Sequence, residues 1–194
     1  MRKKDKHIKF REEILKLFHT KGYRATTMRD IAGQMEFEVA NVYNYIESKQ
    51  LLLQELLFEM VDIINTSLED ILDSSYSTLE KVKHIISLHC QIPAERPYQI
   101  SLISNEWKNL EEEKMTEFLN AFKWHTDQIT ELIKKGMDEG IIRQAEPYIM
   151  TRTFLSCFNW LYTEYPARRK EINPIEIEKQ ISEFVLRSMF VEYY

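Results

Sequence analysis

The sequence has little of what a β-sheet protein needs. Its 194 residues include only 4 Gly and 5 Pro, the residues on which tight turns between strands depend. It also shows no clear run of alternating polar and apolar residues, the pattern of half-buried strands. Hydrophobic residues make up 44% of the chain, which is enough to bury a sizeable core. We therefore predict an all-α fold.

The chain also lacks the residue patterns of common enzymes and metal sites. Cys90 and Cys157 form no CxxC pair, so neither a disulfide framework nor a zinc site is indicated. The sequence contains no Gly-rich phosphate loop, GxSxG or HExxH motif. His84 and His89 are five residues apart and would project from different faces of a helix. We predict no metal, no cofactor and no enzymatic activity.

Long apolar runs are missing too. No stretch approaches the ~18 apolar residues that would span a membrane, and the charged N-terminus has no signal peptide's apolar segment behind it. These two features predict a cytoplasmic protein.

The charge is unevenly distributed along the chain. The net charge of −5 argues by itself against a nucleic-acid partner. Residues 1–50, however, hold 11 of the 26 basic and 7 of the 31 acidic residues, a net of +4, which leaves −9 for the remainder. A basic first segment on an acidic body indicates that one end meets DNA. Residues 1–9, MRKKDKHIK, are either a basic arm for the minor groove or a solvated terminus.

Residues 22–49 predict two short helices joined by a tight corner. Thr27 can cap the first helix, with Asp30 three residues on to complete a capping box. The second helix, about residues 39–45, would turn Val42 and the following Ile46 inward. It would leave Val39, Asn41, Asn44 and Tyr45 facing outward. Ser48 would then cap a longer helix. This is the layout of a helix-turn-helix, whose second helix enters the major groove of DNA.

These residues resemble the N-terminal domain of the TetR family of transcriptional regulators over residues 8–56. The resemblance is carried by Gly22-Tyr23, Thr26-Thr27, Ile31-Ala32, Val42-Tyr43 and Lys49 with Leu52. It implies a homodimeric, all-helical, ligand-controlled DNA-binding protein, usually a repressor. It also implies that Thr27, Tyr43 and Lys49 hold DNA phosphates. The residues that it would bring near bases are Val39, Ala40, Asn41, Asn44 and Tyr45.

Two residues depart from the family's pattern. Glu36 stands at the corner, where the family usually has Gly, and Glu38 stands where a small polar residue is usual. A non-Gly residue in a left-handed turn costs on the order of 1 kcal/mol, and both carboxylates would repel nearby phosphates. A negative charge at the start of a helix nevertheless stabilises it. An alternative stays open: a helical small-molecule-binding or scaffolding protein with a non-functional DNA-binding head.

We predict two domains, a helix-turn-helix domain over residues 1–50 and a helical effector-binding and dimerisation domain over residues 51–194. Proline after residue 92 should end one helix of the second domain. Its helices are expected at 49–72, 77–92, 98–109, 111–139, 147–165 and from 174 to near the C-terminus.

Methionine and aromatic residues are frequent in the second domain. They suit an apolar cavity that repacks around a guest, although a packed core uses the same residue types. Asn159-Trp160 with Tyr162 and Tyr165-Pro166 is similar to a pattern in TetR members that respond to fatty acyl or steroid thioesters. We therefore expect a small hydrophobic effector, of a kind that can bear an acyl group. Candidate pocket residues are Met60, His89, Trp107, Phe122, Phe154 and Phe158.

The last two predicted helices each carry an apolar stripe. Such helices can pair with their copies in a second chain as a four-helix bundle, or they can form the core of a monomer. Family likeness favours the homodimer. Candidate interface residues are Asn159, Tyr162, Ile177, Ile181, Phe184, Val185 and Met189.

Overall fold

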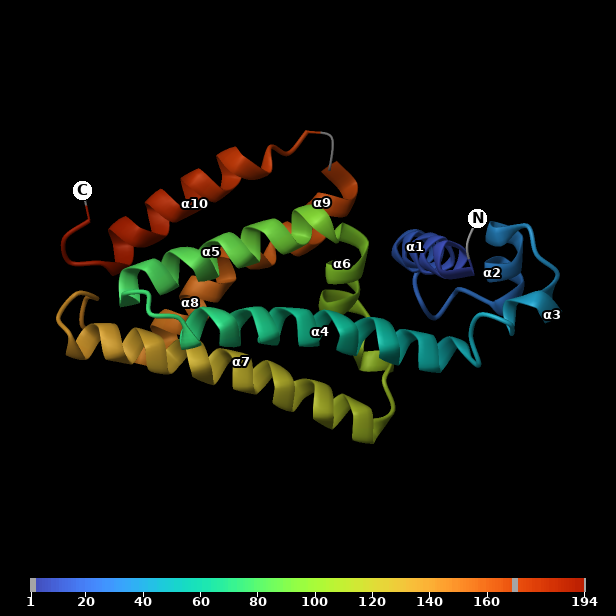
Figure 1. Cartoon of the computed structure of the whole chain (residues 1–194), viewed down its shortest axis with the longest axis horizontal. Helices are drawn as coiled ribbons and strands as arrows, with labels where there is room; N and C mark the ends of the chain where they lie inside the picture. Colours follow the sequence, from blue (N-terminus) through green and yellow to red (C-terminus); the bar gives the residue numbers. More distant parts are fainter. Residues whose placement is uncertain (1–2, 169–170, 194) are drawn as a thin grey trace. The chain divides into compact units, whose positions relative to one another are not determined.

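The protein is all-α, as predicted. The structure, a computed structural model, describes residues 3–168 and 171–193. Over these residues it contains helices and one isolated bridge, between Ile142 and Phe190, but no strand. None of the described helices is both long and apolar enough to cross a membrane. The helices, labelled in Figure 1, are α1 (Lys3–Lys21), α2 (Met28–Met35), α3 (Val39–Val42), α4 (Lys49–Asp73), α5 (Thr78–Glu95), α6 (Pro97–Asn105), η1 (Trp107–Asn109), α7 (Glu112–Asp138), α8 (Pro147–Asn159), α9 (Leu161–Arg168) and α10 (Pro174–Met189).

Contacts divide the chain into two compact units. The head unit comprises Met1–Met60 and Tyr98–Thr116, and the body unit comprises Val61–Pro97 and Glu117–Tyr194. This division differs from the one predicted at residue 50. The first half of α4 packs with the head unit, and α6 and η1 return to it, so the boundary falls inside a continuous helix.

Local capping signals set the start of several helices. The amide of Thr27 donates to the Asp30 carboxylate at 2.7 Å, and the Asp30 amide donates back to the Thr27 hydroxyl at 3.2 Å. Ser77 forms the same reciprocal box at the start of α5. Ser48 accepts from the amide of Leu51 at 3.0 Å and caps α4. The predicted capping residues are therefore confirmed.

One predicted helix end is wrong. Pro93 was expected to stop its helix, but α5 continues through it to Glu95. Proline cannot donate to the carbonyl of the residue four positions earlier and normally kinks or ends a helix. Here the next turn remains closed, since the Arg96 amide donates to the Ile92 carbonyl at 2.8 Å. Pro93 is itself buried, so packing of its ring offsets the lost hydrogen bond.

Two other predicted helices are shorter than expected. The recognition segment is helical only over α3, and Tyr45 follows in a turn whose amide donates to the Val42 carbonyl at 2.9 Å. The helix predicted over 147–165 divides at Trp160 into α8 and α9. Each change reorients the side chains beyond it, which matters for both candidate surfaces below.

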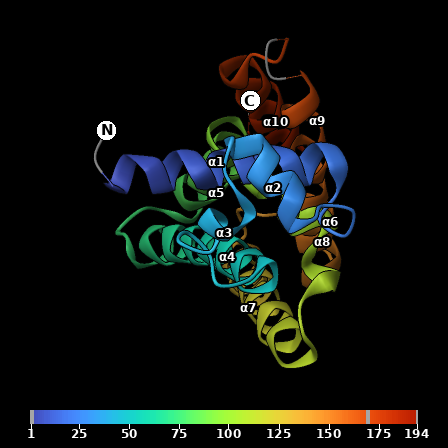
Figure 2. The same cartoon turned by 90° about the vertical axis from the view of Figure 1, so that its right-hand side faces the viewer.

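In the head unit, α2 packs against α1 and α3 packs against α2 (Figure 2). Phe10, Ile14 and Phe18 line the inner side of α1, at most 1% exposed. Ile31 and Val42, from α2 and α3, are fully buried as well. These apolar residues recur every three or four positions, so each helix has one inner face.

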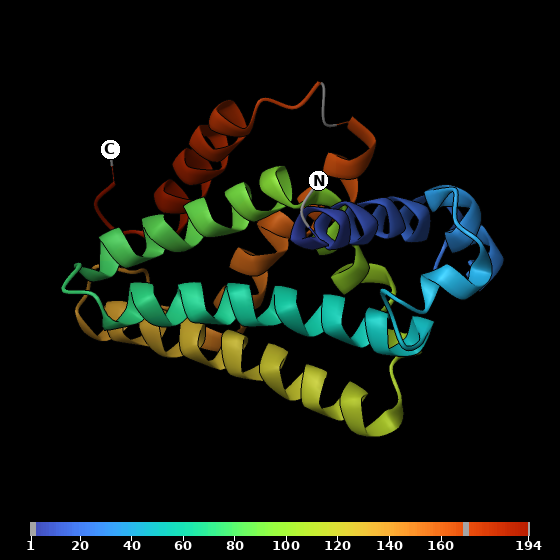
Figure 3. The same cartoon turned by 45° about the vertical axis from the view of Figure 1, so that its right-hand side comes forward.

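In the body unit, α5 and α10 lie side by side, and α5 also contacts α9 (Figure 3). The core consists of the inner side chains of α4, α5, α7, α8, α9 and α10. Gly140, with φ +74°, ends α7 in the left-handed conformation that glycine adopts most easily. The Arg143 amide then donates to the Met189 carbonyl at 2.8 Å, and the Val191 amide to the Ile141 carbonyl at 3.0 Å. The C-terminal end of α10 is thereby fastened to the turn after α7.

The corner residue Glu36 has a left-handed backbone, with φ 56° and ψ 40°. Its carboxylate also stands at the C-terminal end of α2, where the helix dipole disfavours negative charge. We predict that Glu36→Gly raises the free energy of unfolding by about 0.5–1 kcal/mol. Chemical denaturation of the purified protein measures this change.

Glu38 provides the control, because its φ of −71° is ordinary for any residue. Glu38→Gly should leave the protein no more stable. Equal stability of Glu36→Gly and the wild type would show that the corner is unstrained.

Candidate nucleic-acid interface and buried polar network

The recognition segment has one buried and one exposed face. Val42 is fully buried and Ile46 is 8% exposed, so these two side chains fix the segment on the head unit. The other predicted contact residues, apart from Tyr45 and Lys49, are exposed. They are Thr27, Val39, Ala40, Asn41, Tyr43 and Asn44.

Tyr45 does not face outward as predicted. Its ring stacks on Phe10, with ring centroids 4.7 Å apart, and on Phe37, at 5.3 Å. The side chain is half-buried. The turn that follows α3 rotates Tyr45 away from the outer face, and its aromatic ring joins α1 to the corner.

Lys49 holds the head together. Its ammonium donates to the carbonyls of Tyr23, at 2.9 Å, and Thr26, at 2.7 Å. It also lies 4.2 Å from the centre of the Tyr23 ring. Partial burial lowers the pKa of Lys49. Two of its three N–H donors are thus used inside the protein, which leaves one for the DNA phosphate that the sequence assigned to it.

Tyr23 connects the hydrogen bonds of Lys49 to other parts of the head unit. Its hydroxyl donates to Gln50 Oε1 at 2.7 Å, and its amide donates to Glu106 Oε1 at 3.2 Å. The Gln50 amide in turn donates to the Asn109 carbonyl at 2.9 Å. The loop before α2, the start of α4 and η1 are therefore positioned by one set of hydrogen bonds.

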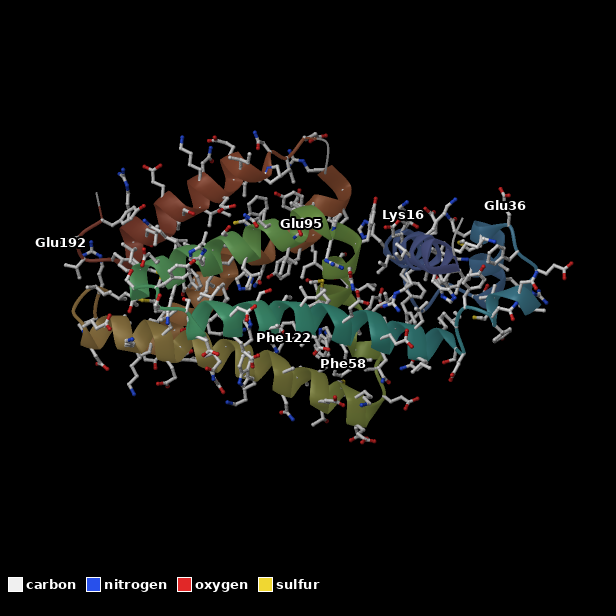
Figure 4. The ribbon with its side chains drawn as sticks, viewed as in Figure 1. Lys16, Glu36, Phe58, Glu95, Phe122 and Glu192 are labelled. Carbon is white, nitrogen blue, oxygen red and sulfur yellow. The ribbon has the colours of Figure 1, made fainter. Side chains whose placement is uncertain are left out.

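Charges of both signs border the exposed face. Glu36 and Glu38 are exposed, and Glu36 points away from the ribbon (Figure 4). The basic Lys21 pairs with Asp30, Nζ to Oδ1, at 2.6 Å. Of the predicted basic arm, Met1 and Arg2 lie outside the described residues, and the segment from Lys3 onward is part of α1.

The six candidate pocket residues fall into both units. Met60 and Trp107 belong to the head unit and the other four to the body unit. His89, Phe154 and Phe158 lie together: the His89 ring stacks on Phe158 at 5.1 Å, and Phe154 meets Phe158 edge-on at 5.3 Å. Phe122, labelled in Figure 4, is 37% exposed, and its assignment to the pocket stays a prediction. It packs on Phe118 along α7 and leaves part of its ring on the surface.

The candidate interface residues all lie in the body unit, but some are buried and others exposed. Val185 and Met189 are buried in the core of their own chain, and Ile177 and Ile181 pack partly against it. The Tyr162 hydroxyl also points inward. Val185 and Met189 were misassigned because a helical stripe does not reveal whether it faces its own core or a second chain. Ile177 and Ile181 are half-buried, and their place in the interface stays a prediction. Asn159 and Phe184 are exposed, as an interface in a partner-free chain requires.

Four polar side chains form a chain of hydrogen bonds inside the body unit. His89 and His125 face each other, with their Nε2 atoms 3.3 Å apart. His89 Nδ1 lies 2.8 Å from the Tyr162 hydroxyl, and His125 Nδ1 lies 3.1 Å from Asn65 Oδ1. The four residues come from α5, α7, α9 and α4 respectively. We call them the buried relay.

The direction of the relay follows from Asn65. The amide of this residue donates to the Ala121 carbonyl at 3.3 Å, so its Oδ1 is an acceptor. His125 must then donate from Nδ1 and accept at Nε2, where His89 donates. His89 Nδ1 accepts from the Tyr162 hydroxyl. Each relay donor and acceptor between Asn65 and Tyr162 is thereby satisfied with both imidazoles neutral.

Burial favours this neutral form. Desolvation lowers the pKa of His89 to about 3 and that of His125 to about 4, and it raises the pKa of Tyr162. Across residues 3–168 and 171–193, no three His, Cys, Asp or Glu side chains gather into a metal-ligating group. The relay is therefore a polar but uncharged feature of the core.

The sequence predicts His89 as a pocket residue but does not identify Asn65, His125 and Tyr162 as its hydrogen-bonding partners. The sequence does contain a signal for His125, which lies at helical spacing on the otherwise apolar stripe of Phe118, Ile129 and Leu132. No comparable signal marks Asn65, since a lone Asn in a helix is usually on the surface.

Two family profiles match the chain. The one described as "Bacterial regulatory proteins, tetR family" matches residues 11–56. The one described as "Tetracyclin repressor-like, C-terminal domain" matches residues 75–189, more than half of the chain. The chain therefore belongs to the TetR family. It is a ligand-responsive, DNA-binding transcriptional regulator of the repressor type.

Individual relatives agree with this assignment. The chain is 23% identical over 181 residues to the HTH-type transcriptional repressor KstR2 of Mycolicibacterium smegmatis, covering 91% of this chain and 88% of the relative. The fold is similar to that of the ketosteroid transcriptional regulator KstR2 of Mycobacterium tuberculosis, with a TM-score of 0.82, 19% identity and 96% of each chain covered. It is also similar to AibR in complex with isovaleryl coenzyme A and operator DNA, with a TM-score of 0.77, 20% identity and coverage of 96% and 99%.

The relay predicts a specific loss of stability in acid. Unfolding returns both imidazoles to a pKa near 6.5, whereas the folded values are lower. Between these values the unfolded chain binds more protons, so stability falls as the pH drops below about 6.5. Each His contributes a slope of up to about 1.4 kcal/mol per pH unit. Denaturation midpoints between pH 6.5 and 5 measure this slope.

The double variant His89→Gln, His125→Gln is the control. It should be less stable at pH 7 but should lose less stability between pH 6.5 and 5, a range above most carboxylate pKa values. Equal slopes in the two proteins would contradict the neutral pair.

Proposed function

We propose that the protein is a homodimeric repressor that binds a palindromic operator and is released by a small hydrophobic molecule. The observation that carries the proposal is the two-faced recognition segment, which buries Val42 and Ile46 and exposes short side chains beside them. Each head would insert residues 39–45 into a major groove. The two half-sites would lie about 34 Å apart or a multiple of that distance.

The exposed side chains have the chemistry for both parts of DNA recognition. Asn41 and Asn44 can each bond an adenine edge in two places, and Val39 and Ala40 can contact thymine methyl groups. Tyr43 and Thr27 carry hydroxyls suited to phosphates, which position the protein without reading sequence. Lys49 would contribute chiefly by fixing the loop before α2, with its remaining N–H toward a phosphate.

Dimerisation would use the outer faces of α8 and α10. Ile149, on α8, is 63% exposed, and Ile175 and Phe184, on α10, are 80% and 68% exposed. Large apolar side chains this exposed suggest a surface that a partner covers. A second copy is the fitting occupant, because a palindromic site requires two heads related by a twofold axis.

The effector would bind in the body unit, which combines an aromatic core with the buried relay. Relatives support a hydrophobic and acyl-bearing molecule: one similar structure is a ketosteroid regulator and another holds isovaleryl coenzyme A. Binding would tilt α4, which contributes to both units, and change the separation of the heads. By linkage the effector must then bind less well when operator is present.

We propose no catalytic role, because the regulators that this chain resembles act by binding. We also propose that the protein is located in the bacterial cytoplasm, because the chromosomal DNA that it would bind lies there.

A second candidate function rests on Glu36 and Glu38. Both carboxylates are exposed at the edge of the recognition segment, where phosphate repulsion would weaken binding. If that repulsion dominates, the protein is a small-molecule-binding or scaffolding protein whose head no longer binds DNA.

Non-specific DNA separates these two functions without knowledge of the operator. We expect the wild type to bind a mixed-sequence 30-bp duplex with an affinity that falls steeply with salt. Tyr43→Phe should lower that affinity about two- to tenfold, the worth of one hydrogen bond. The double variant Glu36→Gln, Glu38→Gln should raise it. Fluorescence anisotropy over a salt series measures all three proteins.

Asn44→Ala is the matched control for these variants, since a base-reading side chain should change non-specific affinity little. Salt-independent binding, or no binding by folded wild type and by the Gln double variant, would favour the alternative in which the head no longer binds DNA.

The dimer surface generates a separate prediction. Phe184→Glu places a charge on the exposed apolar face of α10 and should convert the dimer to a monomer at micromolar concentration, because a buried unpaired charge opposes association. Sedimentation equilibrium measures the change. Tyr76→Glu, at an aromatic residue 47% exposed outside α8 and α10, should leave the dimer intact. A monomeric wild type, or a dimeric Phe184→Glu variant, would place the interface elsewhere.

A further inference from the structure

The head unit contains a cleft of about 410 Å³ that the predicted DNA contacts do not account for. One wall is the segment 21–25, between α1 and α2, and the other consists of residues 105, 106, 108 and 109, at the junction of α6 and η1. Both walls belong to the head unit. The second wall lies outside residues 11–56, the segment that matches the first family profile, so the helix-turn-helix pattern does not predict it.

Hydrogen bonds fix both walls of the cleft. Gly22, with φ +84°, turns the chain out of α1, and its carbonyl accepts from the amide of Thr26 at 3.2 Å and from the hydroxyl of the same residue at 2.7 Å. Across the cleft, Arg24 Nε donates to Asn109 Oδ1. The Asn109 amide group donates in turn to the Glu106 carboxylate at 2.7 Å. The cleft is therefore formed before any partner binds.

Positive charge predominates in the cleft. Lys21, Arg24 and Lys108 line it, with Glu106 as the one carboxylate among the lining residues. This carboxylate already accepts two hydrogen bonds from the protein, and Lys21 is paired with Asp30. Among the side chains that the structure describes, Arg24 and Lys108 form no ion pair. These two cations are thus available to an anionic partner.

The available donors suit phosphate oxygens. Arg24 uses only its Nε inside the protein, so both terminal amino groups of the guanidinium remain, in the fork that matches phosphate geometry. The Lys108 ammonium lies 5.5 Å from the centre of the Trp107 ring and has three N–H donors. Both side chains are exposed. They can therefore reach an anion that keeps part of its hydration, as a DNA phosphate does.

The cleft adjoins the residues already assigned to phosphates. Arg24 precedes Thr27 by three positions, so their Cα atoms are at most about 11 Å apart. Each DNA strand carries one charge for every ~3.4 Å of helix axis, so a backbone held at Thr27 has further phosphates near Arg24. The other wall is bonded next to Lys49, because the Gln50 side chain donates to the Asn109 carbonyl at 2.9 Å.

We propose that this cleft binds backbone phosphates of DNA beside the phosphate assigned to Thr27, with Arg24 acting from one wall and Lys108 from the other. The proposal rests on the proposed function in taking DNA as the partner. It adds a contact from η1, outside the helix-turn-helix. Such contacts set the position of the head on the duplex and read no sequence.

The salt dependence of binding tests this assignment, because it measures how many phosphates the protein neutralises. Arg24→Gln and Lys108→Gln should each flatten the slope of log affinity against log salt by about 0.9. Each should also lower the affinity for the mixed-sequence duplex about five- to tenfold near 0.1 M salt. The double variant should flatten the slope by about 1.8. Fluorescence anisotropy over a salt series measures these changes.

Lys16→Gln is the matched control. It removes one positive charge from α1 in the same unit, where the Lys16 ammonium pairs with Glu13, and should leave the slope unchanged. Equal flattening in Lys16→Gln and Lys108→Gln would show that the net charge of the head, and not the cleft, determines the slope. A merely structural role of Arg24 or Lys108 would lower the melting temperature and leave the slope as in the wild type, which would also contradict the proposal.

A free phosphate compound is another source of the same chemistry. Calorimetric titration of the full chain with pyrophosphate, without DNA, should detect no binding at millimolar concentration, since exposed charges attract a small anion only weakly in water. Pyrophosphate binding that Lys108→Gln abolishes, with an unchanged DNA slope in that variant, would overturn the assignment to DNA.

Failure of this proposal is distinguishable from failure of the proposed function. If the wild type binds the duplex with a salt-dependent affinity and both cleft variants keep its slope, the cleft does not hold DNA, while the proposed function is unaffected. If folded wild type binds no duplex at all, both are overturned.

Discussion

Helix α4 is the constraint on which both units depend. Its first residue, Lys49, clamps the carbonyls of the loop before α2. Sixteen residues later, Asn65 sets the direction of the buried relay. Both positions lie on one continuous helix, which contributes residues to each unit.

The buried relay gives the body unit a property that an apolar core lacks. Polar groups in a core are costly unless each is satisfied, and this chain of hydrogen bonds satisfies its members only while both imidazoles remain neutral. It also joins four helices, so a ligand that perturbs one end acts on all of them.

The sequence predicts the fold well where local chemistry decides it. The box of Thr27 and Asp30 fixes the start of α2, and the Asn173-Pro174 pair fixes that of α10. Prediction fails where tertiary packing decides. Tyr45 turns inward to stack on aromatic residues, and Met189 faces its own core rather than a second chain. A helical stripe has a direction only relative to its neighbours, which spacing alone does not supply.

The central claim is that two identical heads read one symmetric DNA site. Selection from a random double-stranded DNA library with purified full-length protein, at near-physiological salt, tests it most directly. A dimer with two identical heads should enrich a palindrome whose half-sites are separated by about 34 Å or a multiple of that distance. Enrichment of an asymmetric single site would contradict the dimeric arrangement. No enrichment, from protein shown to be folded and free of bound ligand, would contradict sequence-specific recognition itself.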